Sequence, residues 1–302
     1  MVSAHLRRLR LVVPALAAGV ALHACGVIAG TPAHAPATPA PATWSSADLT
    51  VAWIGHASVL IDLGGTTILT DPAFFARVGP SLGGMTIGPK RIVEPALRPE
   101  DLPPLDAVLV SHAHMDSLDR PSLARVRAAP LLVTPPRTRD LVDDLGFARV
   151  VELGWGERVT AGGVAITAFE IAHWGKRWPW DGWRGYNAYL LERGATRVLF
   201  APDTAYTDAV GRIGRTHPLA VAILGIGAYD PWIRHHADPE QAWRMFAASG
   251  ARAMVPVHWD TFRLGKEPVG EAITRLLAAA GPNADRVVIR RIGETWREPC
   301  RG

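Results

Sequence analysis

Short runs of apolar, β-forming residues recur along the chain from Leu49 onward, and turn residues separate them. The first three runs are LTVAWIG, SVLIDL and TTILT, and Gly55, Gly64 and Gly65 punctuate them. This spacing predicts a meander of antiparallel strands. Further runs are DAVLVS, LLVT, VVEL, VAITAFEI, YNAYLLE, RVLFAP, AVAILGI and AMVPVH. The hydrophobic pattern therefore predicts a large β content.

Helical stretches lie between these runs, and the sequence marks several of their ends. The clearest is DPEQAWRMFAASG, in which Asp238 can cap the helix, Gln241 completes a capping box and Gly250 ends the helix. A second stretch, PVGEAITRLLAAAG, closes at Gly281, and a third, RPSLARVRAA, begins near Pro121. Strands interspersed with helices, without a short repeat, predict an α/β or α+β class.

The first 25 residues have the pattern of an export signal. The basic segment MVSAHLRRLR precedes LVVPALAAGVAL, an apolar segment that is too short to span a bilayer comfortably. LHACG then resembles a bacterial lipobox, in which Cys25 would become the lipidated first residue. We therefore predict a signal peptide of lipoprotein type over residues 1–25. Cleavage near the later AHA, an uncleaved anchor and a buried helix are the alternatives.

A Pro/Ala-rich segment over residues 26–45 predicts an extended linker before a folded domain over residues 46–302. A lipidated Cys25 and this linker would hold the domain near a membrane, in the bacterial cell envelope or periplasm. The second cysteine is Cys300, so a disulfide framework and a cysteine-based zinc site are both excluded.

Composition and charge exclude little else. The chain has 302 residues, of which 48% are hydrophobic, so it can bury a sizeable core in one large domain or two small ones. The formal net charge is +4, but three of the cations, Arg7, Arg8 and Arg10, belong to the predicted signal. A basic stripe interleaved with aromatic residues is not seen, which argues against a nucleic-acid partner.

Candidate chemistry begins where DAVLVS ends, because His112, His114 and Asp116 follow it at a spacing of two. In an extended or turn segment such residues face the same way, so the two imidazoles can share a metal and Asp116 continues that face. A polar turn at a strand end is the alternative. Other histidines and aspartates hold similar positions after apolar runs: His56, His173, His258, Asp71 and Asp203.

In these motifs the chain resembles the metallo-β-lactamase superfamily, and within it the branch of phospholipases D that hydrolyse N-acyl-phosphatidylethanolamine. The matching segments are WIGHAS, LTDPAFFARVGP, GPKR, LPPLDAVLVSHAHMDSLD, AHWGKR, PDTAY, IGAYDP, HADPEQA and VHWDTF. Together they cover almost everything from Ala52 to Phe262. The resemblance implies an α/β fold, the αββα sandwich, with two β-sheets packed face to face, helices outside and metals at one edge.

The resemblance also implies a metal centre. The ligands would be His112, His114 and His173 at a first ion, Asp116 and His258 at a second, and Asp203 between them. Imidazole and carboxylate ligands suit one or two zinc ions per chain, and iron or manganese is possible.

Two positions depart from the family pattern. The family usually has a histidine, which binds the second metal, where this chain has Ser117, and a serine hydroxyl is a poor ligand beside imidazole. Pro202 stands where a glycine is common, which could shift the loop that holds Asp203. We therefore expect a tight first site and a weaker second site. Ser117 and Asp119 would lie behind the ligands, unless Asp119 instead caps the following helix.

The chemistry expected of such a centre is hydrolysis. A metal lowers the pKa of a bound water from 15.7 to about 7, which gives hydroxide near neutral pH. Asp116 would orient that water or take its proton. His236 would hydrogen-bond the substrate or steady the leaving group, unless it is a surface histidine beside a helix.

The segment AHWGKRWPWDGWRGY places four tryptophans among cations, directly after the predicted ligand His173. Aromatic and cationic side chains together suit a lipid headgroup and a membrane interface. The candidate substrate-binding residues are Trp174, Lys176, Arg177 and Trp183. The alternative is a loop that packs its tryptophans as a small satellite core. Lys90 and Arg91 could also meet a phosphate, although a solvated turn is the simpler role.

The leading prediction is an exported, metal-dependent phosphodiesterase of phospholipase D type that acts on a phospholipid-like substrate. A hydrolase of a lactone or another carbonyl substrate is the first alternative, because fold does not decide function. A non-catalytic envelope lipoprotein that binds a metal or ligand, and that lost catalysis through Ser117, is the second. The expected partners are a small-molecule or lipid substrate and a membrane, and the sequence makes no prediction of oligomeric state.

Overall fold

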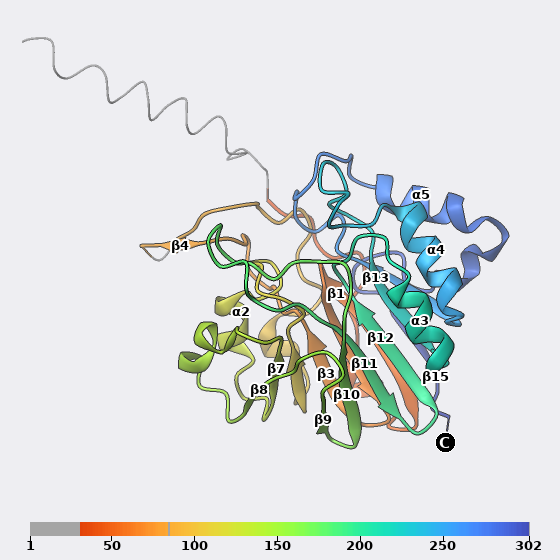
Figure 1. The fold of residues 1–302 in the computed structure, drawn as a ribbon, viewed down its shortest axis with the longest axis horizontal. Coiled ribbons are helices and arrows are strands. Elements are labelled where there is room, and N and C mark those ends of the chain that lie inside the picture. The colour runs from red at the N-terminus through yellow and green to blue at the C-terminus, as the bar shows by residue number, and fades with distance from the viewer. Residues whose placement is uncertain (1–30, 84, 302) are drawn as a thin grey trace, which may run out of the picture.

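The computed structural model describes residues 31–83 and 85–301. Two β-sheets pack against each other, and helices cover their outer sides (Figure 1). The predicted sandwich of two face-to-face sheets with helices outside is therefore confirmed. The predicted signal peptide, with Cys25, lies outside the described residues.

The first sheet has seven strands in the order β15-β1-β2-β3-β6-β7-β8. The strands are β1 (Asp48–Gly55), β2 (Ser58–Leu63), β3 (Thr67–Thr70), β6 (Ala107–Leu109), β7 (Leu132–Thr134), β8 (Val150–Glu152) and β15 (Thr295–Pro299). The predicted antiparallel meander forms β1 to β3. From β3 onward the neighbours β6, β7 and β8 pair in parallel.

The second sheet has six strands in the order β14-β13-β12-β11-β10-β9. The strands are β9 (Arg158–Ala161), β10 (Val164–Phe169), β11 (Ala188–Arg193), β12 (Thr196–Ala201), β13 (Val221–Gly225) and β14 (Ala253–Val257). Neighbours from β9 to β12 pair antiparallel, and β12, β13 and β14 pair in parallel. A separate hairpin consists of β4 (Ser81–Leu82) and β5 (Met85–Thr86).

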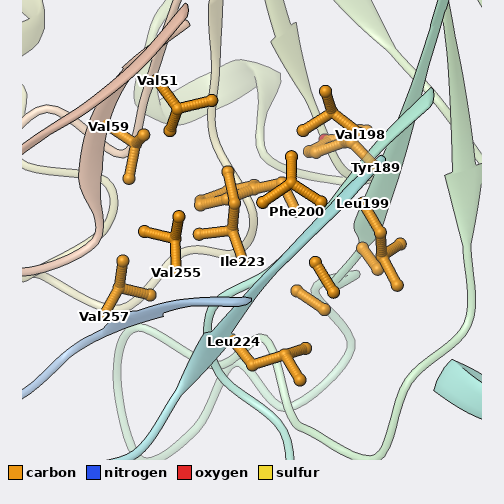
Figure 2. Packing of buried hydrophobic residues seen from close by; sticks show 14 of the residues in the cluster. Val51, Val59, Tyr189, Val198, Leu199, Phe200, Ile223, Leu224, Val255 and Val257 are labelled. Atoms are coloured by element: carbon orange, nitrogen blue, oxygen red, sulfur yellow. The ribbon is translucent and has the colours of Figure 1, made fainter. Parts of the chain in front are cut away.

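The inner faces of the two sheets meet in the main core. Figure 2 shows side chains that fill this space: Val51 and Val59 from the first sheet, and Phe200, Ile223 and Val255 from the second. Successive strand residues point to opposite faces, so Ile54 of β1 packs instead in a second cluster with Leu123 of α2 (Arg120–Arg125). Because both faces of the central strands are covered, they are continuous apolar runs in the sequence.

Three of the predicted helices are present, and their ends are largely those that the sequence marks. In α4 (Pro239–Ser249) the Asp238 carboxylate accepts from the Gln241 amide at 2.7 Å, and the Gln241 side chain accepts from the Asp238 amide. Gly250 ends α4 in the left-handed region, at φ 68°. The other predicted helices are α2, with Pro121 in its first turn, and α5 (Glu271–Ala280), which closes at Gly281.

The apolar pattern did not predict β9, β15 or α3 (Ala209–Thr216). β15 reads TWREP and is partly exposed along its length, because it pairs only with β1 at the edge of the sheet. The short 3₁₀ helices are η1 (Pro41–Thr43), η2 (Pro99–Asp101), η3 (Arg139–Leu141), η4 (Asp143–Leu145) and η5 (Gly281–Arg286).

The last part of the predicted linker contacts the folded body. The Ala33 amide donates to the Ile92 carbonyl at 2.8 Å, and the Glu94 amide donates to the Ala33 carbonyl at 2.8 Å. The chain is therefore attached to the domain from Ala33 onward. Among the residues that the structure describes, none of the helices combines the length and the apolar character needed to cross a bilayer.

Candidate metal centre

Strand direction brings the predicted site residues to one edge of the sandwich. In the first sheet β1, β3 and β6 run the same way, because antiparallel β2 lies between β1 and β3. In the second sheet β10, β12, β13 and β14 likewise run in one direction. The candidate ligands follow these strands: His56 after β1, His112, His114 and Asp116 after β6, His173 after β10, Asp203 after β12 and His258 after β14.

A first cluster contains His112, His114, His173 and Asp203, each of which offers one ligand atom within 4.8 Å of the others. His112 Nε2 lies 2.7 Å from His114 Nδ1 and 3.6 Å from Asp203 Oδ2. His173 Nε2 lies 3.9 Å from the same Asp203 oxygen. Three imidazole nitrogens and a carboxylate therefore converge on one small volume, which suits a single divalent ion.

A second cluster contains His56, Asp116 and His258, and a third contains Asp203, His236 and His258. Asp116 Oδ2 lies 3.0 Å from His56 Nε2 and 3.3 Å from His258 Nε2. His258 Nε2 also lies 3.1 Å from Asp203 Oδ2, so Asp203 and His258 join the clusters. The six predicted ligands are thus brought together, and His56 and His236 stand beside them.

The polar atoms of the centre fit a bound metal. His173 Nε2, both Asp203 oxygens and His258 Nε2 are buried, and none has a well-aligned hydrogen-bond partner within residues 31–83 and 85–301. Buried polar atoms are almost always paired, because an unpaired one has lost its water without compensation. Divalent cations held by these clusters would satisfy these atoms, and imidazole with carboxylate suits zinc, iron or manganese.

The protonation states favour ligation by the first cluster. Burial, aided by His114, lowers the pKa of His112 to about 3, and burial also lowers the pKa of His114 and His173. These imidazoles are therefore neutral at pH 7, and a neutral ring nitrogen is the form that binds a metal.

The charges of the second cluster are coupled. Burial opposes ionisation of Asp116 and Asp203, but the neighbouring His258 holds the pKa of both carboxyls well below the usual range. Burial likewise opposes a charged His258, but the two carboxylates outweigh it and raise the pKa of His258 to about 10. Two carboxylates in one buried site thus favour a cation between them, whether a proton or a metal.

Hydrogen bonds to the Nδ1 atoms, on the side of the ring away from the centre, orient two of the histidines. Ser111 donates its amide to Asp71 Oδ1 at 2.7 Å and its hydroxyl to Asp71 Oδ2. The Ser111 hydroxyl also lies 2.9 Å from His112 Nδ1, which can donate to it. His173 Nδ1 in turn lies 3.0 Å from the His235 carbonyl. In both rings this leaves Nε2 as the acceptor that faces the centre.

Replacing Ser111 with alanine should weaken metal binding about 10- to 100-fold, the usual effect of losing a group that orients a histidine ligand. Competition with a chromogenic chelator measures the affinity. Ser249→Ala is the matched control, because Ser249 is also buried but lies at the end of α4. An unchanged affinity in Ser111→Ala, or an equal loss in the control, would refute the orienting role.

The backbone at the centre is conformationally unusual. His56, Asp71 and His258 have φ of 56°, 32° and 64°, in a region that residues other than glycine seldom occupy. Such residues concentrate at functional sites, where the surrounding structure holds them in place. Three separate strand ends of the same edge therefore carry this strain, and two of the three residues belong to the clusters.

Two glycines allow the loops of the centre to approach each other. A side chain at Gly225 would collide with the Pro202 carbonyl, and one at Gly227 would collide with the His258 carbonyl. The proline before Asp203 is thus accommodated opposite a residue without a side chain. Asp203 reaches the centre despite the departure from the family pattern that the sequence raised as a concern.

The residues expected behind the ligands differ in their roles. Ser117 is fully buried but belongs to none of the three clusters. Asp119 caps α2, because its carboxylate accepts from the Ser122 amide at 3.1 Å. Arg91 is buried and donates to the carbonyls of Phe75 and Ala73, so it is a structural residue and not a contact for phosphate.

A cavity of about 350 Å³ opens over the centre. Asp116, Asp203, His236 and His258 reach it from the clusters, and its other walls include Met115, Trp174, Arg177, Trp232, His235 and Leu264. Of the predicted substrate-binding residues, Trp174 and Arg177 line this cavity. Lys176 lies with its Nζ 4.2 Å from the centre of the Trp174 ring. Trp183 is 54% exposed and does not line the cavity.

His56 is not among the predicted ligands, although its position after an apolar run resembles theirs. The segment WIGHAS carries the signal, because His56 follows β1 as His112 follows β6. Nothing in the sequence alone relates His56 to Asp116, 60 residues later, and only the sheet brings them within 3.0 Å.

Residues 66–259 match the beta-lactamase superfamily domain. An uncharacterized protein of Mycobacterium tuberculosis is 34% identical over 256 residues, which are 82% of this chain and 68% of that protein. N-acyl-phosphatidylethanolamine-hydrolyzing phospholipase D 1 of Caenorhabditis elegans is 32% identical over 245 residues, which are 73% of this chain and 66% of the enzyme. The alignments thus span about two thirds of these relatives.

Solved structures share the fold at low sequence identity. The isothiocyanate hydrolase from Delia radicum gut bacteria has a TM-score of 0.66 and 18% identity, over 83% of this chain and 100% of that chain. A metallo-beta-lactamase fold protein from Bacillus subtilis has a TM-score of 0.57 and 16% identity, over 83% of this chain and 99% of that chain.

Proposed function

Because the chain belongs to the metallo-β-lactamase superfamily and carries a histidine–aspartate metal site, we propose that this metal-dependent hydrolase is a phosphodiesterase of phospholipase D type that acts on a phospholipid-like substrate. The observation that carries the proposal is the pair of ligand clusters joined through Asp203 and His258. Two metals side by side can stabilise both the attacking and the leaving oxygen of a phosphodiester.

In this proposal His56 completes the second site. It takes the place of the histidine that is missing at Ser117, because its Nε2 lies 3.0 Å from Asp116 Oδ2 and in one cluster with His258. An imidazole from β1 thus restores a nitrogen ligand that β6 does not supply. We therefore propose a second site stronger than the sequence led us to expect.

The chain's own groups have distinct roles around the reacting atoms. Asp116 is ionised and lines the cavity, so it can accept a proton from an attacking water. Burial lowers the pKa of His236 to about 4, so this ring is neutral at pH 7 and can donate a hydrogen bond to a substrate oxygen. Both groups reach the cavity beside Asp203.

The cavity wall supports a phosphate group that carries apolar chains. Arg177 is fixed by hydrogen bonds from its Nη1 to the carbonyls of Ala113 and Leu118, at 3.1 and 2.9 Å. Its guanidinium borders the cavity and offers a positive charge to a phosphate. Trp174, Trp232 and Leu264 supply apolar surface around it. The similarity to an enzyme named for hydrolysing N-acyl-phosphatidylethanolamine supports the same substrate class.

The purified protein with added zinc should hydrolyse a chromogenic phosphodiester with a higher kcat/KM than a simple lactone. A higher kcat/KM for the lactone would favour a carbonyl hydrolase, the first alternative. No turnover of either compound, with zinc, iron or manganese, would favour a non-catalytic binding protein. His112→Ala removes a ligand of the first cluster, so activity that survives it unchanged would place the chemistry elsewhere.

We also propose that the protein is exported and anchored through a lipid on Cys25, which lies outside the described residues. Metabolic labelling with radioactive palmitate tests the lipid, because the wild-type chain should incorporate the label and the Cys25→Ser variant should not. An unlabelled wild-type chain, or a labelled Cys25→Ser variant, would contradict a lipid on Cys25.

A further inference from the structure

Two segments next to residues that line the cavity expose large apolar side chains. One is residues 178–183 and the other is residues 232–233. We name their exposed side chains the aromatic rim: Trp178 (36% exposed), Trp180 (69%), Trp183 (54%), Trp232 (46%) and Ile233 (42%). Side chains of this size are seldom left exposed together, and a group of them marks an interaction surface.

The chain beside each segment contributes to the wall of the same cavity. Trp174, just before the first segment, and Trp232, in the second, line the same cavity. The Trp174 ring stacks on the His235 ring with a centroid distance of 4.1 Å and an interplanar angle of 1°. Arg177 ties the first segment to the loop of His114 and Asp116 through the Ala113 carbonyl. The aromatic rim therefore lies beside the walls of the cavity, next to Trp174 and Arg177 on one side and at Trp232 on the other.

The aromatic rim is held in place without being buried. The Asp181 carboxylate accepts from the amides of Arg177 and Trp178 at 2.8 and 2.7 Å, and from Arg184 Nε at 2.6 Å. Trp178 and Trp180 stack on each other at 5.6 Å, yet both remain exposed. The tryptophans thus do not form the satellite core that was the alternative. Side chains that are already held in place lose little conformational entropy when they bind a partner.

The charges beside the aromatic rim are mainly positive. Lys176 lies over Trp174, Arg177 borders the cavity, and Arg234 is exposed next to Ile233. The opposing charges include the exposed Asp230, the exposed Asp140, which pairs with Arg184, and the buried Asp181, which pairs with the same arginine. Such a surface complements anionic lipid headgroups, because each cation near the surface strengthens the attraction to them. Tryptophan favours the same interfacial layer.

The described chain begins at the same edge of the sandwich (Figure 1). Ala33 pairs with the segment at Val93, and Arg91 of that segment forms a β-bridge with Phe262. The Phe262 ring lies 5.2 Å from the His56 ring, at the metal centre. Ala33 stands eight positions after Cys25, a reach of at most about 29 Å when fully extended. A lipid on Cys25 would hold this edge, and not the opposite one, near the bilayer.

We propose that the aromatic rim docks the cavity mouth onto the surface of an anionic lipid bilayer. The inference rests on the proposed function, because a phospholipid substrate must leave a bilayer to enter the cavity. A bilayer suits the aromatic rim better than a folded protein partner does, since the tryptophans, the cations and the start of the chain all lie on one edge. Docking would place the metal centre directly over its substrate.

Site-specific fluorescence tests the docking. In the full chain, Cys25→Ser and Cys300→Ser remove the native thiols, and one new cysteine carries an environment-sensitive dye. The rim positions are Trp180→Cys and Ile233→Cys. The control is Ala195→Cys, which is exposed and whose amide contacts Arg301 near the carboxyl terminus, at the opposite edge (Figure 1). The probe is vesicles of phosphatidylcholine with phosphatidylglycerol.

If the aromatic rim docks, the emission of dyes at positions 180 and 233 should shift to the blue when vesicles are added, and these dyes should be protected from an aqueous quencher. A dye at position 195 should show neither effect. Labels at 180 and 233 that stay in water would overturn the inference, even if the chain binds vesicles through its first residues. Equal shifts at all three positions would also overturn it, because they indicate adsorption without orientation. The dyes report contact with the bilayer even when no substrate is hydrolysed. Hydrolysis of a soluble short-chain phosphodiester, in turn, tests the proposed activity in the absence of a bilayer. Failure of the inference and failure of the proposed function are therefore distinguishable.

A charge variant tests the choice of an anionic surface. Arg234→Gln should weaken partition into the anionic vesicles roughly fivefold at low salt, and should not change partition into pure phosphatidylcholine. Arg215→Gln is the matched control, because Arg215 is exposed in the last turn of α3, before β13 begins at the opposite edge. Equal effects of the two variants would overturn the electrostatic part of the inference.

Discussion

Replacing Asp203 with alanine should lower kcat/KM for a phosphodiester by about a thousandfold or more. Asp203 belongs to two clusters and lies 3.6 Å from His112 Nε2 and 3.1 Å from His258 Nε2. Among the residues that the structure describes, Asp203 is the carboxylate that two of the clusters share, and a metal ion is worth several kcal/mol of charge stabilisation in the transition state. Each 1.36 kcal/mol of lost transition-state stabilisation lowers the rate tenfold, so a loss of several kcal/mol corresponds to a decrease in kcat/KM of about a thousandfold.

The matched control for Asp203→Ala is Asp62→Ala. Asp62 is also largely buried, but its carboxylate supports the turn between β2 and β3 through the Gly65 amide. We expect Asp62→Ala to lose some stability and to keep its kcat/KM. Far-UV circular dichroism establishes that both variants are folded. An Asp203→Ala variant that retains more than about a tenth of wild-type activity would mean that Asp203 holds no metal needed for turnover.

Replacing His56 with alanine should lower activity in a way that depends on the leaving group. If His56 completes the second site, the variant loses the ion that stabilises the leaving oxygen. We expect a loss of roughly a hundredfold for an alkyl phosphodiester, and a clearly smaller loss for a nitrophenyl ester, whose leaving group needs little help. Steady-state rates on a matched pair of substrates measure the difference.

His217→Ala is the control for His56→Ala, because His217 is a half-buried histidine that follows α3 and faces Glu192. It should leave both rates unchanged. An equal loss on the two substrates in His56→Ala would point to a general structural effect. Unchanged rates on both substrates in His56→Ala would show that His56 is not part of the metal centre.

Much of the centre could be predicted because each ligand follows directly on an apolar run. His112, Asp203 and His258 come after β6, β12 and β14, and the shared direction of these strands brings their ends to one edge. The helix α4 could also be predicted from the sequence, because its capping box is a local feature of Asp238 and Gln241. Local chemistry and a strong periodic pattern therefore predict both the core and the ligands.

The rest depends on contacts between distant segments. β15 is a polar edge strand whose existence follows from pairing with β1. The approach of His56 to Asp116 requires the finished first sheet, and so does the hydrogen bond between Ser111 and Asp71. The accommodation of Pro202 depends on Gly225 in the neighbouring strand. None of these contacts can be recognised from the pattern of hydrophobic and polar residues along the sequence.

The most direct test of a two-metal hydrolase is the metal content of the purified protein, measured by mass spectrometry after exposure to excess zinc and removal of free ions. We predict about two equivalents per chain, held by the clusters around His112 and around His56, with Asp203 between them. About one equivalent would contradict a second site completed by His56 and would favour substrates with easier leaving groups. A protein that takes up no zinc, iron or manganese would contradict the metal-dependent hydrolase itself.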